Sequence, residues 1–132
     1  NPNSRVCPPR AWPRVRVQLP RILIVDDEAL IAALLSDWIV ELGHEPVGPA
    51  AGEDAALKLI DVTPPHAAIL DVSLTGGDSF ALARACRERS IPFAFATGHE
   101  KGRVPHDLAD APVLAKPFAF DDVEQLLAKL LA

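Results

Sequence analysis

Residues 21–28 read RILIVDDE, a run of apolar residues that ends in three acidic ones. The same arrangement, an apolar run followed at once by a polar residue, recurs in AAILD at 67–71, FAFAT at 93–97 and VLAK at 113–116. Short, continuous apolar runs are typical of strands that are buried on both faces of a parallel sheet. These four segments therefore predict four strands of such a sheet.

Residues 45–50 predict a fifth, weaker strand. The segment contains Pro46 and Pro49, and because proline cannot donate to a β-ladder, this strand belongs at an edge of the sheet. Apolar residues at helical spacing predict helices at about 30–42, 53–61, 78–89 and 121–131. Strands that alternate with helices predict an α/β fold, a doubly wound five-stranded parallel sheet with strand order 2-1-3-4-5.

Two of these helices carry capping residues at their predicted starts. Asp78 is expected to be the N-cap of the helix at 78–89. Asp121 and Glu124 form a capping-box-like pair at the start of the last helix. The stretch 99–112 holds one glycine, two prolines and few apolar residues, so it does not predict a full helix.

Composition and charge divide the chain in two. Residues 1–20 hold five of the thirteen prolines, four arginines and no acidic residue, so we expect a disordered or linker arm outside the fold. The expected domain, 21–132, contains the other nine basic residues and all eighteen acidic ones. An acidic body argues against nucleic acid as the partner of the domain itself.

The same sequence argues against a membrane protein and against a thiol-based metal site. No apolar run approaches the roughly 20 residues that a membrane-spanning helix needs, and no secretory signal is seen. Cys7 and Cys86 lie too far apart, with too few partners, for a zinc cluster or a disulfide framework. We expect a reducing, cytoplasmic compartment.

In a doubly wound sheet, ligands bind beyond the carboxyl ends of the strands. At those ends the sequence places Asp26 and Asp27, Asp71, Thr97 and Lys116, in that order along the chain. Clustered carboxylates repel one another unless a cation joins them, and a hard ion such as Mg²⁺ or Mn²⁺ suits oxygen ligands. The metal, the ammonium and the hydroxyl would stabilise a transferring phosphoryl group, and one carboxylate would be the nucleophile.

These residues resemble the conserved positions of bacterial response-regulator receiver domains, and the resemblance extends over 21–132. Val25-Asp26-Asp27-Glu28 is similar to the family's acidic pocket, and ILDVSL at 69–74 is similar to the segment that bears the phosphorylated aspartate. Thr97 resembles the switch threonine, and Lys116-Pro117-Phe118 resembles the Lys-Pro pair whose peptide bond is usually cis.

The resemblance implies the flavodoxin-like receiver fold and a site that accepts phosphate on Asp71 from a sensor histidine kinase or a phosphotransfer protein. It implies that Asp27, Asp71 and the backbone carbonyl of Ser73 ligate the metal directly, with Asp26 acting partly through water. Thr97 and Lys116 would stabilise the phosphoryl group. The domain would be a signalling phospho-acceptor rather than an enzyme with a separate substrate.

The sequence also departs from the family's usual pattern. Thr75 stands where a proline is usual, and Val113 stands where an aromatic switch residue usually lies. PFAFATG at 92–98 resembles the signature of a stand-alone subgroup nicknamed the FAT GUY regulators, which also lacks that aromatic residue. We therefore expect a stand-alone regulator in which residues 100–111 are mobile and reorder when Asp71 is phosphorylated.

Two other readings stay open from the sequence. One is a phosphohydrolase with an aspartyl nucleophile, although such enzymes usually carry a second Asp two residues further on, where this chain has Ser73. The other is a degenerate receiver used only for protein binding, against which the complete set of three aspartates, a threonine and a lysine argues. The sequence does not identify the downstream partner.

Overall fold

The computed structural model describes residues 18–74, 76–98 and 103–132. Its helices and strands are, in chain order, β1 (Arg21–Val25), α2 (Ala29–Glu41), β2 (Glu45–Ala50), α3 (Glu53–Val62), β3 (Ala67–Asp71), β4 (Ser73–Leu74), β5 (Gly77–Asp78), α4 (Phe80–Glu88), β6 (Phe93–Thr97), the 3-10 turn η2 (His106–Leu108), β7 (Val113–Ala115) and α5 (Phe120–Leu130). None of the helices in these described ranges is long and apolar enough to cross a membrane.

The five main strands form one parallel sheet in the order β2-β1-β3-β6-β7. Since β4 and β5 pair only with each other, in a small antiparallel ribbon, this order is the predicted order 2-1-3-4-5. The fold prediction is therefore confirmed, including the edge position of the proline-containing strand β2. The ribbon was not predicted.

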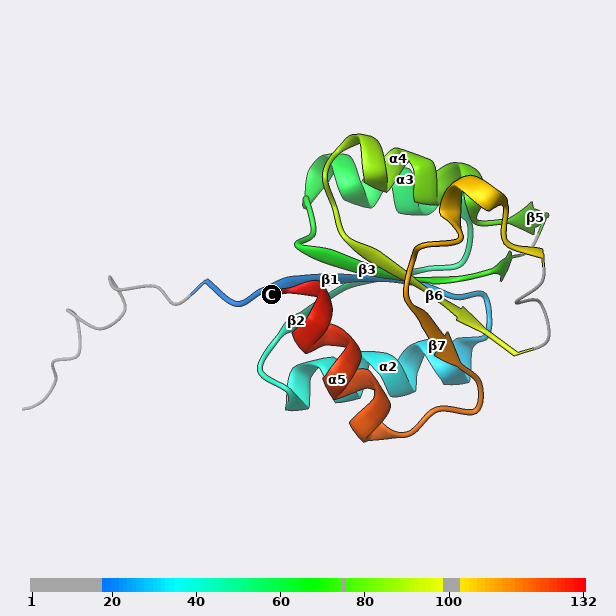
Figure 1. Ribbon diagram of the computed structural model, residues 1–132. Helices are drawn as coiled ribbons and strands as arrows, with labels where there is room; N and C mark the ends of the chain where they lie inside the picture. Colours follow the sequence, from blue (N-terminus) through cyan, green and yellow to red (C-terminus); the bar gives the residue numbers. More distant parts are fainter. Residues whose placement is uncertain (1–17, 75, 99–102) are drawn as a thin grey trace, which may run out of the picture.

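Helices cover both faces of the sheet, with α3 and α4 on one side and α2 and α5 on the other (Figure 1). The side chains of each central strand alternate between the two faces, as the pleat requires. In β1, Leu23 and Val25 pack towards α3 and α4, whereas Ile22 and Ile24 pack towards α2 and α5. All four are almost completely buried, which explains why the segment is apolar throughout rather than alternating.

Two predicted helix caps are wrong in detail. The N-cap of α4 is Ser79, and Asp78 acts from one residue further back by accepting a hydrogen bond from the Phe80 N–H at 3.0 Å. At α5 the predicted Asp121–Glu124 pair is replaced by Asp122, whose carboxylate accepts the Ala119 N–H at 2.8 Å. Both helices start near the predicted residues, because an acidic side chain still satisfies a free backbone donor of the first turn.

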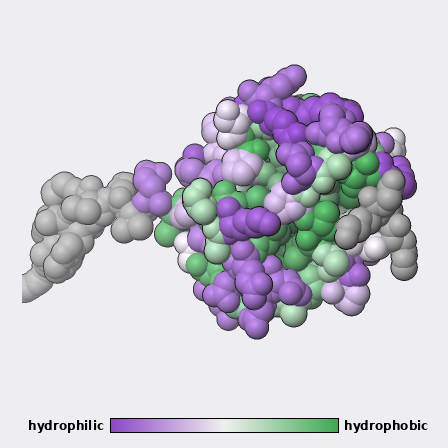
Figure 2. Space-filling model, viewed as in Figure 1, coloured by the Kyte–Doolittle hydropathy of each residue, from purple (hydrophilic) through white to green (hydrophobic). Residues whose placement is uncertain are grey.

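The predicted arm lies almost entirely outside the described residues, which begin at Gln18. The carbonyl of Pro20 accepts a hydrogen bond from the Glu45 N–H at 2.8 Å, so contact with β2 begins at the residue before β1. In the view of Figure 2, hydrophilic residues cover the outer sides of the helices, and apolar residues come to the surface between them, near β7. Val113 of that edge strand is 36% exposed.

Candidate phosphorylation site

The acidic site lies at the carboxyl ends of β1 and β3. Asp26 and Asp27 follow β1, and Asp71 is the last residue of the neighbouring parallel strand β3. One carboxylate oxygen from each of the three residues lies within 4.8 Å of the others. The predicted acidic cluster is therefore present, because adjacent parallel strands end at the same edge of the sheet.

Lys116, the residue after β7, brings a positive charge to this cluster. Its ammonium nitrogen lies 3.3 Å from Asp71 Oδ2 and 3.5 Å from Asp26 Oδ2. A third carboxylate, that of Glu28, lies 3.4 Å from the same nitrogen. The sequence did not single out Glu28 as a partner of Lys116. Glu28 is the N-cap of α2, so its side chain reaches the site only because the helix begins next to the acidic pair.

Burial and charge shift the protonation of the two central groups. Burial and the neighbouring carboxylate of Asp26 raise the pKa of Asp71 to about 6, against the opposing effect of Lys116. Burial alone would lower the pKa of Lys116, but the carboxylates of Asp26 and Asp71 outweigh it and raise that pKa above its ordinary value. The lysine therefore stays charged at neutral pH, and the negative charge of Asp71 is disfavoured when no cation is bound.

The donor set suits a hard divalent cation. Asp26 is 3% exposed, and its Oδ2 atom accepts no hydrogen bond; its nearest charged partner is the Lys116 ammonium, at the ion-pair distance of 3.5 Å. Its other oxygen, Oδ1, accepts the Glu28 N–H at 2.8 Å, which fixes the carboxylate's orientation. Three carboxylates with an unsatisfied, buried oxygen match the ligand preference of Mg²⁺ and Mn²⁺.

Thr97 and Ser73 lie at the same edge of the sheet. Thr97 ends β6, beside β3, and is 2% exposed; its carbonyl accepts the Lys116 N–H at 2.9 Å. Ser73 starts β4 and donates its backbone N–H to the Asp71 carboxylate. The Lys116–Pro117 peptide bond is cis. The two aspartates after β1, Asp71, Thr97 and Lys116 thus lie at the ends of the strands predicted for them, whereas Ser73 lies two residues beyond the end of β3.

The segment between β6 and β7 contains contacts that the sequence analysis missed. Arg84 of α4 donates to both carboxylate oxygens of Asp107, at 2.9 and 3.1 Å. Arg87, one turn further along α4, donates to the carbonyl of Asp107 at 2.8 Å and pairs with Asp110 at 3.2 Å. Leu108, at 1% exposure, is inserted beneath them. The described residues of this segment are therefore fastened to α4, whereas 99–102 lie outside the description.

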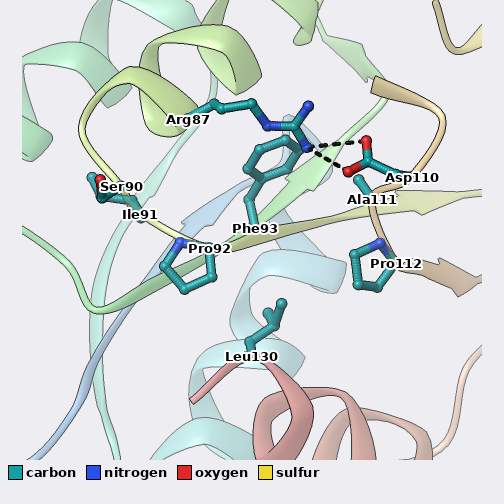
Figure 3. Close-up of a pocket in the computed structure, with 9 residues that line it drawn as sticks. All are labelled: Arg87, Ser90, Ile91, Pro92, Phe93, Asp110, Ala111, Pro112 and Leu130. Atoms are coloured by element: carbon teal, nitrogen blue, oxygen red, sulfur yellow. Dashed lines mark hydrogen bonds and ion pairs between the residues drawn. The ribbon is translucent and has the colours of Figure 1, made fainter. Parts of the chain in front are cut away.

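A pocket lies beside the ion pair of Arg87 and Asp110, away from the acidic cluster (Figure 3). The guanidinium of Arg87 lies 5.3 Å from the centroid of the Phe93 ring, a cation–π contact, while it pairs with Asp110. Phe93 begins β6, so the pocket is at the amino ends of the strands, opposite to Asp71. It holds none of the residues of the acidic site.

Comparison with known protein families shows which family has this fold and this set of site residues. Residues 22–128 match the response regulator receiver domain family, and the chain belongs to that family. It is a receiver domain of two-component response regulators, a class of signalling domains.

Similar proteins include regulators from several bacteria. The transcriptional regulatory protein PdtaR of Mycobacterium tuberculosis is 31% identical over 107 residues, which are 78% of this chain and 52% of that protein. The transcriptional regulatory protein BaeR of Escherichia coli is 38% identical over 79 residues, 59% of this chain and 32% of that protein. The chain therefore spans about half the length, or less, of these curated relatives.

Solved structures agree with the fold. SdrG from Sphingomonas melonis is 44% identical with a TM-score of 0.77, over 89% of this chain and 100% of SdrG. The receiver domain of NtrX from Brucella abortus is 28% identical with a TM-score of 0.75, over 83% of this chain and 97% of that domain. SdrG has also been solved in a BeF3-activated conformation, which matches with a TM-score of 0.75.

Proposed function

We propose that this domain takes a phosphoryl group onto Asp71 from a sensor histidine kinase or a phosphotransfer protein, in a reaction that needs Mg²⁺ or Mn²⁺. The phosphorylated form then changes which proteins the domain contacts. The donor and the domain would meet in the cytoplasm, and neither a membrane nor a nucleic acid takes part in the domain's own reaction.

The observation that carries this proposal is the convergence of one buried carboxylate with a fixed ammonium and an acidic pair. Asp71 is 5% exposed and has Lys116 at 3.3 Å and the carboxylates of Asp26 and Asp27 beside it. Lys116 is the ion-pair partner of three carboxylates at this edge, so it brings a fixed positive charge to the position where a phosphoryl group on Asp71 would lie. The BeF3-activated form of SdrG, a 44% identical protein, supports the same chemistry here.

The step at Asp71 is a phosphoryl transfer. A carboxylate oxygen of Asp71 forms a bond to phosphorus while the P–N bond of the donor's phosphohistidine breaks, and the imidazole nitrogen leaves with the electron pair. Lys116 is placed to donate to a phosphoryl oxygen, and the hydroxyl of Thr97 would donate to another. Asp26, Asp27, Asp71 and the carbonyl of Ser73 would hold the divalent cation, which supplies positive charge to the phosphoryl oxygens when bound.

The phosphohydrolase alternative is less well supported. Its second acid would stand at Ser73, whose hydroxyl oxygen instead accepts a hydrogen bond from Arg103 at 3.1 Å. A hydroxyl at that position cannot protonate a leaving group as a carboxylic acid would. A phospho-acceptor needs no such acid, because the leaving imidazole of a phosphohistidine takes its own proton from water.

Intact-mass measurement after incubation with phosphoramidate and MgCl₂ tests the proposal. One phosphoryl adduct per chain is expected, and none in EDTA or in Asp71→Asn. Asp37→Asn, which neutralises an exposed acid on α2, is the matched control and should label as the unmodified chain does. Full labelling of Asp71→Asn would refute the assignment, and many turnovers of p-nitrophenyl phosphate per chain would favour the phosphohydrolase.

A further inference from the structure

Arg103 lies at the edge of the phosphorylation site without being part of the set described above. Its Nη1 donates to the hydroxyl oxygen of Ser73 at 3.1 Å. Ser73 is two residues after Asp71, and its backbone N–H is bonded to the Asp71 carboxylate. The guanidinium is thus held by a residue whose own backbone contacts the carboxylate that would carry the phosphoryl group.

The partner of this guanidinium differs from the partners of the arginines on the neighbouring helix α4. The three arginines of α4 and its C-cap each pair with a carboxylate: Arg84 with Asp107 at 2.9 Å, Arg87 with Asp110 at 3.2 Å and Arg89 with Asp61 at 3.6 Å. Arg103 has no ion-pair partner among the residues that the structure describes and bonds a neutral hydroxyl instead. Charged acceptors hold a guanidinium about twice as strongly as neutral ones, so this contact is easily exchanged for an anion.

Phosphorylation would supply that anion. It replaces the single charge of the Asp71 carboxylate by about two charges on three outward-facing oxygens. Lys116 already serves three carboxylates, those of Asp26, Glu28 and Asp71, and cannot neutralise the added charge alone. An arginine, with its fork of donors, is the side chain best suited to phosphoryl oxygens.

We propose that Arg103 is a phosphoryl-binding residue, whose guanidinium leaves the Ser73 hydroxyl and contacts the phosphoryl group on Asp71. This inference rests on the proposed function of Asp71. It also gives the β6–β7 segment a direct link to the site, because Arg103 is at the start of the same segment whose Asp107 is fastened to Arg84. No large aromatic side chain would be needed for the signal.

Isothermal titration with beryllofluoride in the presence of Mg²⁺ tests the inference on the full chain. We expect the affinity to fall about five- to tenfold in Arg103→Ala, which corresponds to about 1 to 1.4 kcal/mol, and to be largely kept in Arg103→Lys. Arg103→Gln separates charge from structure, because its amide can still donate to the Ser73 hydroxyl but has no charge. It should lose affinity as the alanine variant does. Arg89→Ala, which removes an equal charge from the ion pair between the C-cap of α4 and Asp61 of α3, should bind beryllofluoride as the unmodified chain does.

Titration of Mg²⁺ alone adds a readout that a structural role would not produce. Removing a cation next to the acidic cluster should leave Mg²⁺ binding unchanged or slightly tighter in Arg103→Ala, opposite in sign to the beryllofluoride effect. Equal beryllofluoride affinity in Arg103→Ala and the unmodified chain would overturn the inference, as would full affinity in Arg103→Gln. Failure of the unmodified chain to bind beryllofluoride at all would instead count against the proposed function of Asp71.

Discussion

Asp71→Asn should stabilise the domain when no metal is bound, although it removes the residue on which the proposed function depends. Burial and the neighbouring Asp26 raise the pKa of Asp71 from 3.8 to about 6. A carboxyl whose pKa is higher in the folded state favours folding only while it is protonated. That contribution is complete below the unfolded pKa of about 4 and is lost as pH rises through 6.

The magnitude follows from the shift. A shift of about two pKa units corresponds to about 3 kcal/mol at pH 8, where Asp71 is ionised in both states, and to about half of that at pH 5. Asparagine has nearly the same shape and carries no charge at any pH. The free energy of unfolding of Asp71→Asn should therefore exceed that of the unmodified chain by up to about 3 kcal/mol at pH 8, and the excess should shrink by about half at pH 5.

Urea unfolding in EDTA, followed by circular dichroism at both pH values, measures this difference. Asp37→Asn, at an exposed position of α2, is the control and should change the free energy of unfolding by no more than about 0.5 kcal/mol. Saturating Mg²⁺ should remove the advantage of Asp71→Asn, because the cation stabilises only the ionised cluster. A less stable Asp71→Asn at pH 8, or a difference that does not depend on pH, would refute the account of the site's electrostatics.

Three further outcomes are expected. Asp27→Ala should weaken Mg²⁺ binding at least about tenfold by calorimetry and raise Tm by about 1–2 °C in EDTA, since one repelling charge is gone; a lower Tm in EDTA would contradict a shared acidic pocket. Beryllofluoride should change the amide exchange of residues 100–111 more than that of the rest of the domain, and strong protection there in both states would defeat the predicted reordering. Arg84→Ala should accelerate exchange of the Leu108 amide by about two- to fivefold, because it removes the bidentate bond to Asp107, while unchanged exchange would show that apolar packing alone holds the segment.

The sheet and the acidic site could be predicted because one physical rule links them. An apolar run that ends in a polar residue indicates a buried strand with a functional group at its carboxyl end, and parallel strands bring those ends to one edge. For this reason the carboxylates of Asp26 and Asp71 both lie within 3.5 Å of the Lys116 ammonium, although the three residues are far apart in the sequence. Glu28 follows the same rule only in part, since its ion pair with Lys116 depends on where α2 starts.

Contacts made by the connecting segments could not be predicted in the same way. The 3-10 turn at His106–Leu108 is held by two arginines of α4, and nothing in its own sequence indicates which charges it meets. A poorly periodic segment can be well anchored when its few apolar residues, such as Leu108, enter a core formed by other elements. The predicted cap of α5 was wrong for a similar reason. Several acidic residues in the first turn could accept the Ala119 N–H, and only the local backbone conformation selects Asp122.

The identity of the residue that carries the phosphoryl group is the central claim, and reductive trapping tests it directly. Borohydride reduces an acyl phosphate of aspartate to homoserine, so the chain would be phosphorylated with phosphoramidate and Mg²⁺, reduced, digested and sequenced by tandem mass spectrometry. The account predicts homoserine at position 71 and at no other aspartate. Homoserine at position 26 or 27, or a full phosphoryl adduct that yields no homoserine, would contradict it.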